Sequence, residues 1–394
     1  MTFLASAAPS HVNPTLAIAT ALLRRGASVS YLAEDSARER VEAIGARFIR
    51  IEEEATPAQQ DRLPASARTS LRRAVARREG LLGALRQAPR VLGLARAERS
   101  DVIVLDRTTG WHGVASALGR PIVTFVPSFF FAADSPLVQA GVPTGSDLES
   151  PRLQQADREL SSLQTELLRD YGITPIDPDR LFTAPADLNV SASFRELQPD
   201  GARFSRPGYL YLGPPVADRD EPPLPELDRL PRPLIYAAFG SAEPTDPRLL
   251  KLLLDAFRGQ SWGVVAAGKR PRSLPAWCLV RPRVPQLQVL SQANVFVTHA
   301  GINSILEAIN FRVPMILFPR TREQRFVADQ VVRLGLGVLR SRADVTAGDL
   351  RVDAENLIRS STVHQRLERA RECALAADGA KAAADAILGL ARSV

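Results

Sequence analysis

A short segment in the second half of the chain carries polar side chains in a pattern suited to binding an anion. It follows the strand-like run 294–298 and reads His-Ala-Gly-Ile-Asn-Ser over residues 299–304, where a predicted helix begins. The first amides of a helix point out of its amino end and bind phosphate oxygens readily. Gly301 lets the backbone approach such a ligand closely, because glycine has no Cβ. The side chains that add hydrogen-bond donors are those of His299, Asn303 and Ser304.

The same segment also has an interpretation that needs no ligand. Ser304 and Glu307 fit the capping box, in which side chains satisfy the first amides of a helix. Many helices use that pattern for stability alone. The segment by itself therefore leaves both a diphosphate site and a plain helix cap open.

A histidine near the N-terminus is placed where it can act as a base. Asn13-Pro14 is typical of a helix start, so His11 is expected on the loop between the first strand and this helix. A lone histidine is more often structural than catalytic, yet a neutral imidazole can remove a hydroxyl proton at physiological pH. Asp106 ends the strand-like run 102–105 and is expected at the same sheet edge, which makes it the candidate acid that orients the imidazole.

Both candidate sites depend on strands that end at one sheet edge, and the chain supplies such strands. Short apolar runs alternate with helix-like stretches, which is typical of parallel βαβ units. The first half begins with strands at 2–7 and 28–32 and helices at 14–25 and 36–45. The second half has strands at 234–239, 263–267, 294–298 and 314–318, and helices at 246–257, 303–311 and 324–334.

The run 213–233 interrupts this alternation with prolines and charges, so we place a linker there. The predicted fold is α/β, with two tandem Rossmann-like domains over 1–212 and 234–394 that face each other across a cleft. The pattern is helical from 345 onward, and the last helix is expected to be able to pack back on the first domain. Ligands of such sheets bind at the carboxyl ends of the strands.

The composition is that of an ordinary globular chain. Of its 394 residues 45% are hydrophobic and 24% are charged, and its two cysteines, Cys278 and Cys373, cannot form a disulfide framework or a cysteine metal cluster. No apolar run is long enough to span a membrane and no basic leader is present, so a cytoplasmic protein is expected. The net charge of +7 comes mainly from arginines spread along the whole chain, which does not indicate nucleic acid binding.

One dense basic run lies at 68–99, with arginines among leucine and alanine at helical spacing. A solvated helix face is the favoured interpretation. The alternative is a basic amphipathic helix that lies on an anionic membrane surface.

The anion-binding segment is part of a longer set of motifs. Val284-Pro285-Gln286 precedes it, and Val313-Pro314-Met315 and Arg322-Glu323-Gln324 follow it. No packing rule requires that combination. The set resembles the nucleotide-sugar signature of the family-1-type glycosyltransferases of the GT-B fold, and more narrowly the bacterial macrolide glycosyltransferases. The resemblance is close over 284–338, fair over 1–32 and 193–200, and weak over 52–180.

The resemblance implies which residues of the second domain contact the nucleoside of the donor. Gln286 and the backbone of Val284 would contact the base, and Glu307 would bond the ribose hydroxyls. Many relatives have tryptophan before the Val-Pro-Gln element to stack on the base, whereas this chain has Arg283. A guanidinium plane can also stack on a base, so the base preference stays open between uracil and thymine.

The resemblance also implies contacts to the diphosphate and the sugar. Glu323 and Gln324 would bond the hydroxyls of the sugar, since carboxylates and amides suit such groups. Hydrogen-bond donors suit phosphate oxygens. The residues that would hold the diphosphate are His299, Gly301, Asn303 and Ser304, together with the turn Gly240-Ser241 after the strand 234–239.

The first domain resembles the family at its catalytic histidine. The family has a Gly-His-x-x-Pro element, and residues 10–14 match it with serine in place of glycine. The resemblance implies that His11 is the general base and that Asp106 is its partner. The spacing after Asp106 is one residue shorter than the family's, which leaves Asp101 or a rearranged loop as the alternative. His112 is expected to be a helix residue.

The resemblance implies an inverting, metal-independent hexosyltransferase that needs no cofactor. Its donor would be a UDP- or TDP-sugar, and its acceptor a hydroxyl of a small lipophilic natural product such as a polyketide, macrolide or flavonoid, bound by the first domain. Metal-dependent transferases hold their cation with an Asp-x-Asp pair. Two such pairs, at 177–179 and 218–220, lie in proline-rich stretches and are expected to be turn and linker residues. We expect a monomer or a homodimer.

Three alternatives use the same fold. The arginine run at 68–99 motivates a peripheral membrane glycosyltransferase with a lipid or carotenoid acceptor. A GT-B nucleotide-sugar epimerase would instead act on the donor itself, and incubation with donor alone separates it from a transferase. A donor-binding protein without activity is disfavoured by the presence of both His11 and Asp106.

Overall fold

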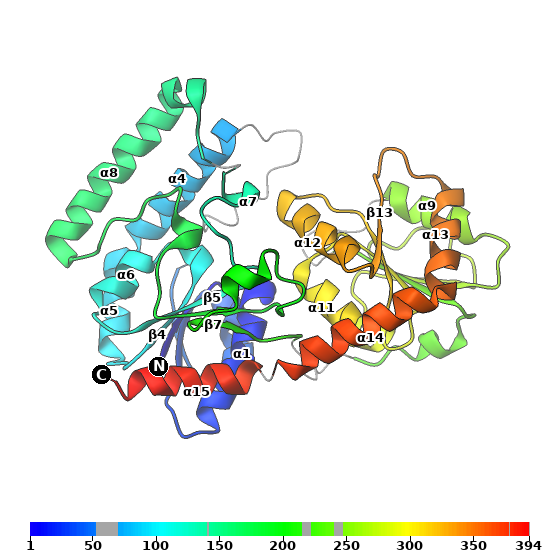
Figure 1. The fold of residues 1–394 in the computed structure, drawn as a ribbon, viewed down its shortest axis with the longest axis horizontal. Helices are drawn as coiled ribbons and strands as arrows, with labels where there is room; N and C mark the ends of the chain where they lie inside the picture. The colour runs from blue at the N-terminus through cyan, green and yellow to red at the C-terminus, as the bar shows by residue number, and fades with distance from the viewer. Residues whose placement is uncertain (53–69, 140–141, 215–221, 240–246, 378, 394) are drawn as a thin grey trace. The chain divides into compact units, whose positions relative to one another are not determined.

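The computed structural model describes residues 1–52, 70–139, 142–214, 222–239, 247–377 and 379–393. The chain divides into two compact units (Figure 1). Unit 1 comprises Met1–Ser193, Asp200–Gly213 and Ala377–Val394, and unit 2 comprises Phe194–Pro199 and Pro214–Ala376. Residues 194–199 thus group with unit 2, which the sequence did not indicate, and the last helix groups with unit 1.

Unit 1 is built on a parallel sheet of seven strands in the order β3-β2-β1-β4-β5-β6-β7. Parallel pairing requires crossovers, which the intervening helices and loops provide. The strands are β1 Thr2–Leu4, β2 Ser30–Ala33, β3 Arg47–Arg50, β4 Ile103–Asp106, β5 Ile122–Val126, β6 Leu188–Ser191 and β7 Tyr209–Tyr211.

Helices cover both faces of this sheet. Those of unit 1 are α1 Pro9–Leu23, α2 Arg38–Ala43, α4 Ser70–Arg86, α5 Ala88–Ala97, α6 His112–Ala117, α7 Pro136–Gln139, α8 Pro151–Tyr171 and α15 Gly379–Ala391. On the first face, Phe3, Tyr31 and Val104 form one core with residues of α1 and α15. On the second face, Leu4 and Leu105 form another core with residues of α4, α5, α6 and α8. Alternate residues of each strand therefore belong to opposite cores, as the pleat of a strand requires.

Unit 2 repeats the design with a parallel sheet of six strands in the order β10-β9-β8-β11-β12-β13. The strands are β8 Leu234–Ala238, β9 Gly263–Ala267, β10 Cys278–Arg281, β11 Val295–Thr298, β12 Met315–Leu317 and β13 Gly337–Leu339. The helices are α9 Pro247–Phe257, α10 Gln286–Leu290, α11 Ile302–Asn310, α12 Arg322–Arg333, α13 Ala347–Arg359 and α14 Ser361–Ala376. The two α/β units confirm the predicted fold class.

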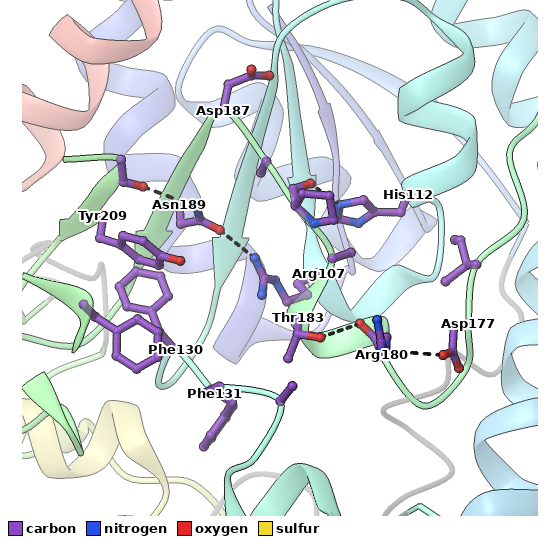
Figure 2. Close-up of a pocket in the computed structure, with 18 of the residues that line it drawn as sticks. Arg107, His112, Phe130, Phe131, Asp177, Arg180, Thr183, Asp187, Asn189 and Tyr209 are labelled. Atoms are coloured by element: carbon purple, nitrogen blue, oxygen red, sulfur yellow. Dashed lines mark hydrogen bonds and ion pairs between the residues drawn. The ribbon is translucent and has the colours of Figure 1, made fainter. Parts of the chain in front are cut away.

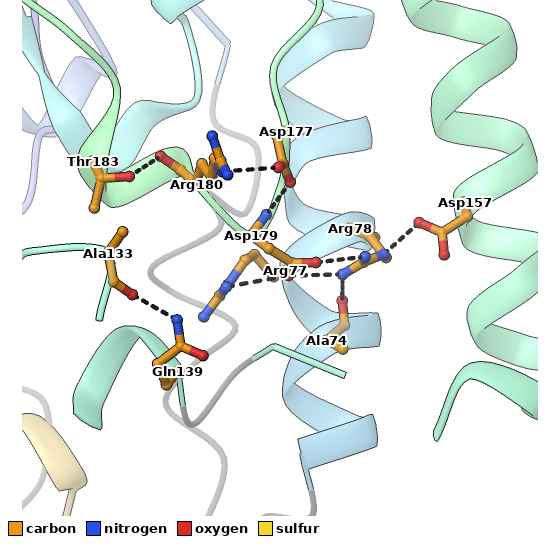
Figure 3. A network of polar contacts seen from close by, with 10 residues as sticks. All are labelled: Ala74, Arg77, Arg78, Ala133, Gln139, Asp157, Asp177, Asp179, Arg180 and Thr183. Carbon is orange, nitrogen blue, oxygen red and sulfur yellow. Dashed lines mark hydrogen bonds and ion pairs between the residues drawn. The ribbon is translucent and has the colours of Figure 1, made fainter. Parts of the chain in front are cut away.

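The basic run of α4 is only partly solvated. Arg73, Arg77 and Arg78 are buried, at most 7% exposed, so the predicted solvated face is wrong for these three residues. Figure 1 shows α4 and α8 side by side, and Figure 3 shows the polar network around them. Arg78 donates from Nε to Asp157 on α8 at 2.5 Å and from Nη2 to Asp179 at 2.9 Å. Their carboxylates outweigh the effect of burial and raise the pKa of Arg78.

The last helix of the chain lies against α1 within unit 1. Gly379, its first residue, has no room for a side chain, because a Cβ there would lie 2.2 Å from the Cα of Leu212. Arg25, just after α1, donates to Asp385 on α15 at 2.7 Å. None of the helices in the described ranges is both long and apolar enough to cross a membrane.

Candidate functional site

The structure brings His11 and Asp106 together. Asp106 is the last residue of β4, and its Oδ2 lies 2.8 Å from Nδ1 of His11. The Asp106 side chain is 1% exposed and that of His11 is 14% exposed. Asp101, the alternative partner, precedes β4 and is therefore at the opposite end of the strand from Asp106. The carboxylate that orients the histidine is thus the one at the carboxyl end of the strand.

Hydrogen bonds hold the Asp106 carboxylate in place. Its Oδ1 accepts from the Thr108 amide at 2.9 Å and from the Thr108 hydroxyl at 2.7 Å. Burial alone would raise the pKa of Asp106, but the His11 imidazole and the bonds from Thr108 outweigh it and lower the pKa. An ionised Asp106 only accepts, so Nδ1 of His11 donates the proton between them. The basic lone pair of the neutral imidazole then lies on Nε2.

His11 is part of a helix, which differs from the expected loop. α1 begins at Pro9, with Ala8 as N-cap, and the amides of His11 and Val12 both donate to the Ala8 carbonyl. Proline suits a first helical position because it has no amide hydrogen to satisfy there. Asn13, the expected N-cap, instead accepts from Arg40 at 3.0 Å through Oδ1. His11 is therefore fixed by the first turn of α1 and by Asp106.

The second candidate site is the amino end of α11 in unit 2. This helix follows β11 closely, its N-cap is Gly301, and no side chain caps it. The capping-box interpretation of Ser304 and Glu307 is therefore wrong, although α12 and α13 do carry such boxes. The N-cap glycine has no side chain to bond the first amides of the helix, and the positive dipole of that end suits an anion.

The residues before α11 have a constrained geometry. A Cβ at Gly301 would lie 2.7 Å from Nε2 of His299, so glycine makes room for the imidazole against the backbone. Ala300 has φ of 66°, a left-handed conformation that costs a non-glycine residue energy. Burial lowers the pKa of His299 to about 4. The hydrogen bond to the Ala238 carbonyl raises this pKa, and the positive charge of Arg342 lowers it further. His299 is therefore neutral at physiological pH.

The residues expected to contact the nucleoside form one hydrogen-bonded cluster. Gln286 donates from Nε2 to Glu307 at 2.5 Å and to Ser304 at 3.2 Å. Its Oε1 accepts from the hydroxyl of Tyr236 on β8 at 3.0 Å. Glu307 is 2% exposed. The sequence did not single out Tyr236, because nothing near it in the chain resembles the motif it joins.

The remaining predicted donor contacts lie near the amino ends of α10 and α12 or outside the described residues. Glu323 is exposed in the first turn of α12. The Oε1 of Gln324 accepts from the Thr321 amide at 3.1 Å as part of a capping box, which leaves its Nε2 to donate elsewhere. Val284 is half-buried and precedes α10, and Arg283 is exposed. Gly240 and Ser241 lie outside the described residues.

Arg342 is a further cation that the sequence did not indicate. It follows β13, and its guanidinium lies over the ring of Phe239 at 5.2 Å from the centroid. Its positive charge lowers the pKa of His299. The residue carries no local motif, and only the order of the strands places it near the end of β11.

The Asp-x-Asp pair in unit 1 has structural partners. Asp179 accepts from Arg77 and Arg78, and Asp177 accepts from the Asp179 amide at 2.8 Å within a turn. The pair at 218–220 lies outside the described residues. Within the part of the chain that the structure describes, no group of three or more His, Cys, Asp or Glu side chains could hold a metal ion.

Known glycosyltransferases resemble this chain in sequence and in fold. The family model for "UDP-glucoronosyl and UDP-glucosyl transferase" matches residues 256–368. The NDP-glycosyltransferase YjiC of Bacillus subtilis is 28% identical, over 95% of this chain and 93% of that protein. The demethyllactenocin mycarosyltransferase of Streptomyces fradiae is 26% identical, over 97% and 84%. The solved structure of the kitacinnamycin glycosyltransferase superposes with a TM-score of 0.82 at 24% identity, covering 99% of this chain and 98% of that one.

The chain is a nucleotide-sugar glycosyltransferase of the GT-B fold, as the sequence predicted. Within that class it is related to the UDP-glucuronosyl and UDP-glucosyl transferases and to bacterial macrolide glycosyltransferases.

Proposed function

We propose that the protein transfers a hexose from a UDP- or TDP-sugar to a hydroxyl of a small lipophilic acceptor, with inversion at the anomeric carbon and without a metal ion. The observation that carries the proposal is the bond of 2.8 Å between Nδ1 of His11 and the buried carboxylate of Asp106. That bond fixes the tautomer whose Nε2 can take a proton.

The proposed reaction is a single displacement. Nε2 of His11 accepts the proton of the acceptor hydroxyl while the hydroxyl oxygen forms a bond to the anomeric carbon. The bond from that carbon to the diphosphate oxygen breaks, and the diphosphate leaves with the electron pair. Asp106 stabilises the imidazolium that forms, since its lowered pKa keeps it ionised. Attack opposite the leaving group inverts the configuration.

The donor would be held by unit 2. The amino end of α11 offers backbone amides and a positive dipole to the diphosphate, while the single N–H of the neutral His299 is donated to the Ala238 carbonyl. Glu307 is buried beside Gln286, where a ribose with two hydroxyls can bond to it. Fixed donors of this kind stabilise the charge of a leaving diphosphate without reorganising.

The absence of a required metal is part of the proposal. Asp177 and Asp179 are engaged with a turn amide and with two arginines, which supports a structural use of that pair. The leaving diphosphate would be stabilised by the α11 amides instead. Turnover should therefore survive dialysis against EDTA.

The proposal is tested by the product itself. UDP- and TDP-sugars are first screened by thermal shift, and acceptors are then screened by mass spectrometry with the donor that stabilises the protein most. The anomeric configuration of the product is read from its ¹H NMR coupling constant. An α-linked donor should yield a β-linked product in the presence of EDTA. Retention of configuration, or a strict need for a divalent cation, would exclude the proposed mechanism.

A further inference from the structure

Unit 1 contains a large pocket whose lining includes neither His11 nor Asp106. Its volume is about 970 Å³, and residues of β6 and β7 and of the loops that follow β4 and β5 line it (Figure 2). The residues of its lining that carry the argument are Arg107, His112, Phe130, Arg180, Asn189 and Tyr209. A cavity of this size can enclose a small organic molecule.

The pocket lies on the other face of the sheet from the catalytic pair. Asp106 bonds to His11, which belongs to α1 on the first face. Leu105, one residue earlier, belongs to the core of the second face, and Arg107, one residue later, bonds to Asn189. Side chains alternate between faces along a strand. Neither His11 nor Asp106 lines the pocket, so the pocket is a separate site.

Arg107 is a buried cation without a counterion. Its side chain donates from Nη2 to Oδ1 of Asn189 at 2.7 Å and from Nη1 to the Phe182 carbonyl, and the residue is 6% exposed. Among the residues that the structure describes, no carboxylate is paired with Arg107, and its buried Nε has no hydrogen-bond partner. Burial lowers the pKa of Arg107 to about 10, so it stays charged at neutral pH.

A buried charge of this kind is costly unless an opposite charge compensates it. The two aspartates of the pocket lining, Asp177 and Asp187, do not pair with Arg107. Asp187 accepts from the Ile122 amide at 2.8 Å, and Asp177 accepts from the Asp179 amide and pairs with Arg180. The lining therefore keeps an excess of positive charge next to Arg107.

The opposite wall is aromatic. Phe130 and Tyr209 meet edge to face with ring centroids 4.9 Å apart, and Figure 2 shows them on one side of Arg107 with His112 on the other. His112 bonds through Nε2 to the Pro185 carbonyl at 3.1 Å, and burial lowers its pKa, so Nδ1 carries a lone pair that has no partner. Aromatic edges and faces bind flat rings by contacts of this kind.

We propose that this pocket binds a small aromatic oxyanion, with its carboxylate or phosphate at Arg107 and its ring against Phe130 and Tyr209. The site goes beyond the transfer reaction, because it lies apart from His11 and needs neither donor nor acceptor. Its ligand would act next to Asp106, since Arg107 is the following residue. Guanidinium groups bind carboxylates and phosphates with two parallel hydrogen bonds, and Arg107 has unused N–H groups on both Nη atoms.

Calorimetry with three matched probes tests the proposal. The probes are 1-naphthoate, 1-naphthyl phosphate and the neutral 1-naphthamide, which share one ring system. We expect at least one of the two anions to bind the intact protein more than about tenfold tighter than the amide, as a charge-assisted bond contributes that much. Which anion binds tighter identifies the oxyanion that the site prefers. Equal binding of all three probes would overturn the proposal.

Two variants locate the binding. Arg107→Gln should bring the anions to the affinity of the amide, and Ala184→Trp, which fills the pocket from a half-buried lining position, should weaken all three probes. The second variant leaves Arg107 in place and covers the case in which the first does not fold. Arg96→Gln, an exposed arginine on α5, is the matched control and should bind like the wild type. Unchanged anion binding in Ala184→Trp would overturn the proposal.

The His11→Ala variant separates this site from the transfer site. It should bind the anionic probes normally, because His11 does not line the pocket. The same variant is expected to lose transfer, so failure of one proposal does not imply failure of the other. Competition between the naphthoate and the sugar acceptor would overturn the separate location.

Discussion

Replacing Asp106 with asparagine should remove most of the turnover while leaving the fold intact. The Oδ1 of asparagine can keep both bonds from Thr108, at 2.9 and 2.7 Å in the native protein. The amide NH2 then faces Nδ1 of His11 where a carboxylate oxygen stood at 2.8 Å. Two donors cannot share that contact, so the imidazole must carry its proton on Nε2 instead. The lone pair that should accept the acceptor proton is lost.

The expected loss of kcat can be estimated from enzymes in which an aspartate orients a histidine base in the same way. Substitution of the orienting aspartate by asparagine lowers kcat by about 10³–10⁴-fold, which corresponds to about 4–5.5 kcal/mol in activation free energy. We expect kcat to fall by that factor and the Kd of the donor, measured by calorimetry, to stay within about twofold. Asp170→Asn, which changes an exposed carboxylate on α8, is the matched control. A kcat within tenfold of the wild type would refute the role of Asp106.

Three further predictions concern the donor site and the core. Gly301→Ala places a Cβ 2.7 Å from Nε2 of His299 and should weaken donor binding by about tenfold or more in calorimetry, whereas Gly389→Ala, which meets nothing within 4 Å in α15, should leave it unchanged. Burial lowers the pKa of His299 from 6.5 to about 4, so the unfolded chain takes up this proton first as pH falls. The free energy of unfolding should therefore be highest above pH 6.5 and should fall by up to about 3 kcal/mol towards pH 4 in denaturant titrations. The fall should be smaller in His299→Asn, and an equal fall in both proteins would contradict the assignment. Asp157→Ala takes one of two carboxylates from the buried Arg78 and should lower the free energy of unfolding by about 1–3 kcal/mol; an unchanged denaturation midpoint would show that the bond of 2.5 Å contributes nothing.

The elements with long apolar runs could be predicted closely from the sequence. The run 263–267 coincides with β9, and the helix expected at 303–311 is α11 at Ile302–Asn310. Strands such as β7 and β13 have three residues each and pair at sheet edges, so their pattern is too short to show a period. These segments are strands because they pair with a neighbouring strand, and that pairing cannot be seen in the local sequence.

The same distinction applies to the site residues. His11 and Asp106 could be paired in advance because parallel strands end at one sheet edge. Tyr236 and Arg342 could not be predicted, because Tyr236 reaches Gln286 from β8, Arg342 acts on His299 from the turn after β13, and neither has a local motif. The burial of Arg78 could not be predicted either, since its partner Asp157 lies on another helix far along the chain.

The most direct test is turnover and donor binding of His11→Ala, measured side by side with His364→Ala. His364 is exposed on α14 and bonds to the Ile358 carbonyl, so its loss controls for the removal of an imidazole. We predict that His11→Ala lowers turnover by at least about a hundredfold, because general base catalysis contributes at least that much. Its calorimetric Kd for the donor should equal that of the wild type, because the donor contacts that we propose lie in unit 2. Wild-type turnover in His11→Ala would contradict the central claim that this imidazole removes the acceptor proton.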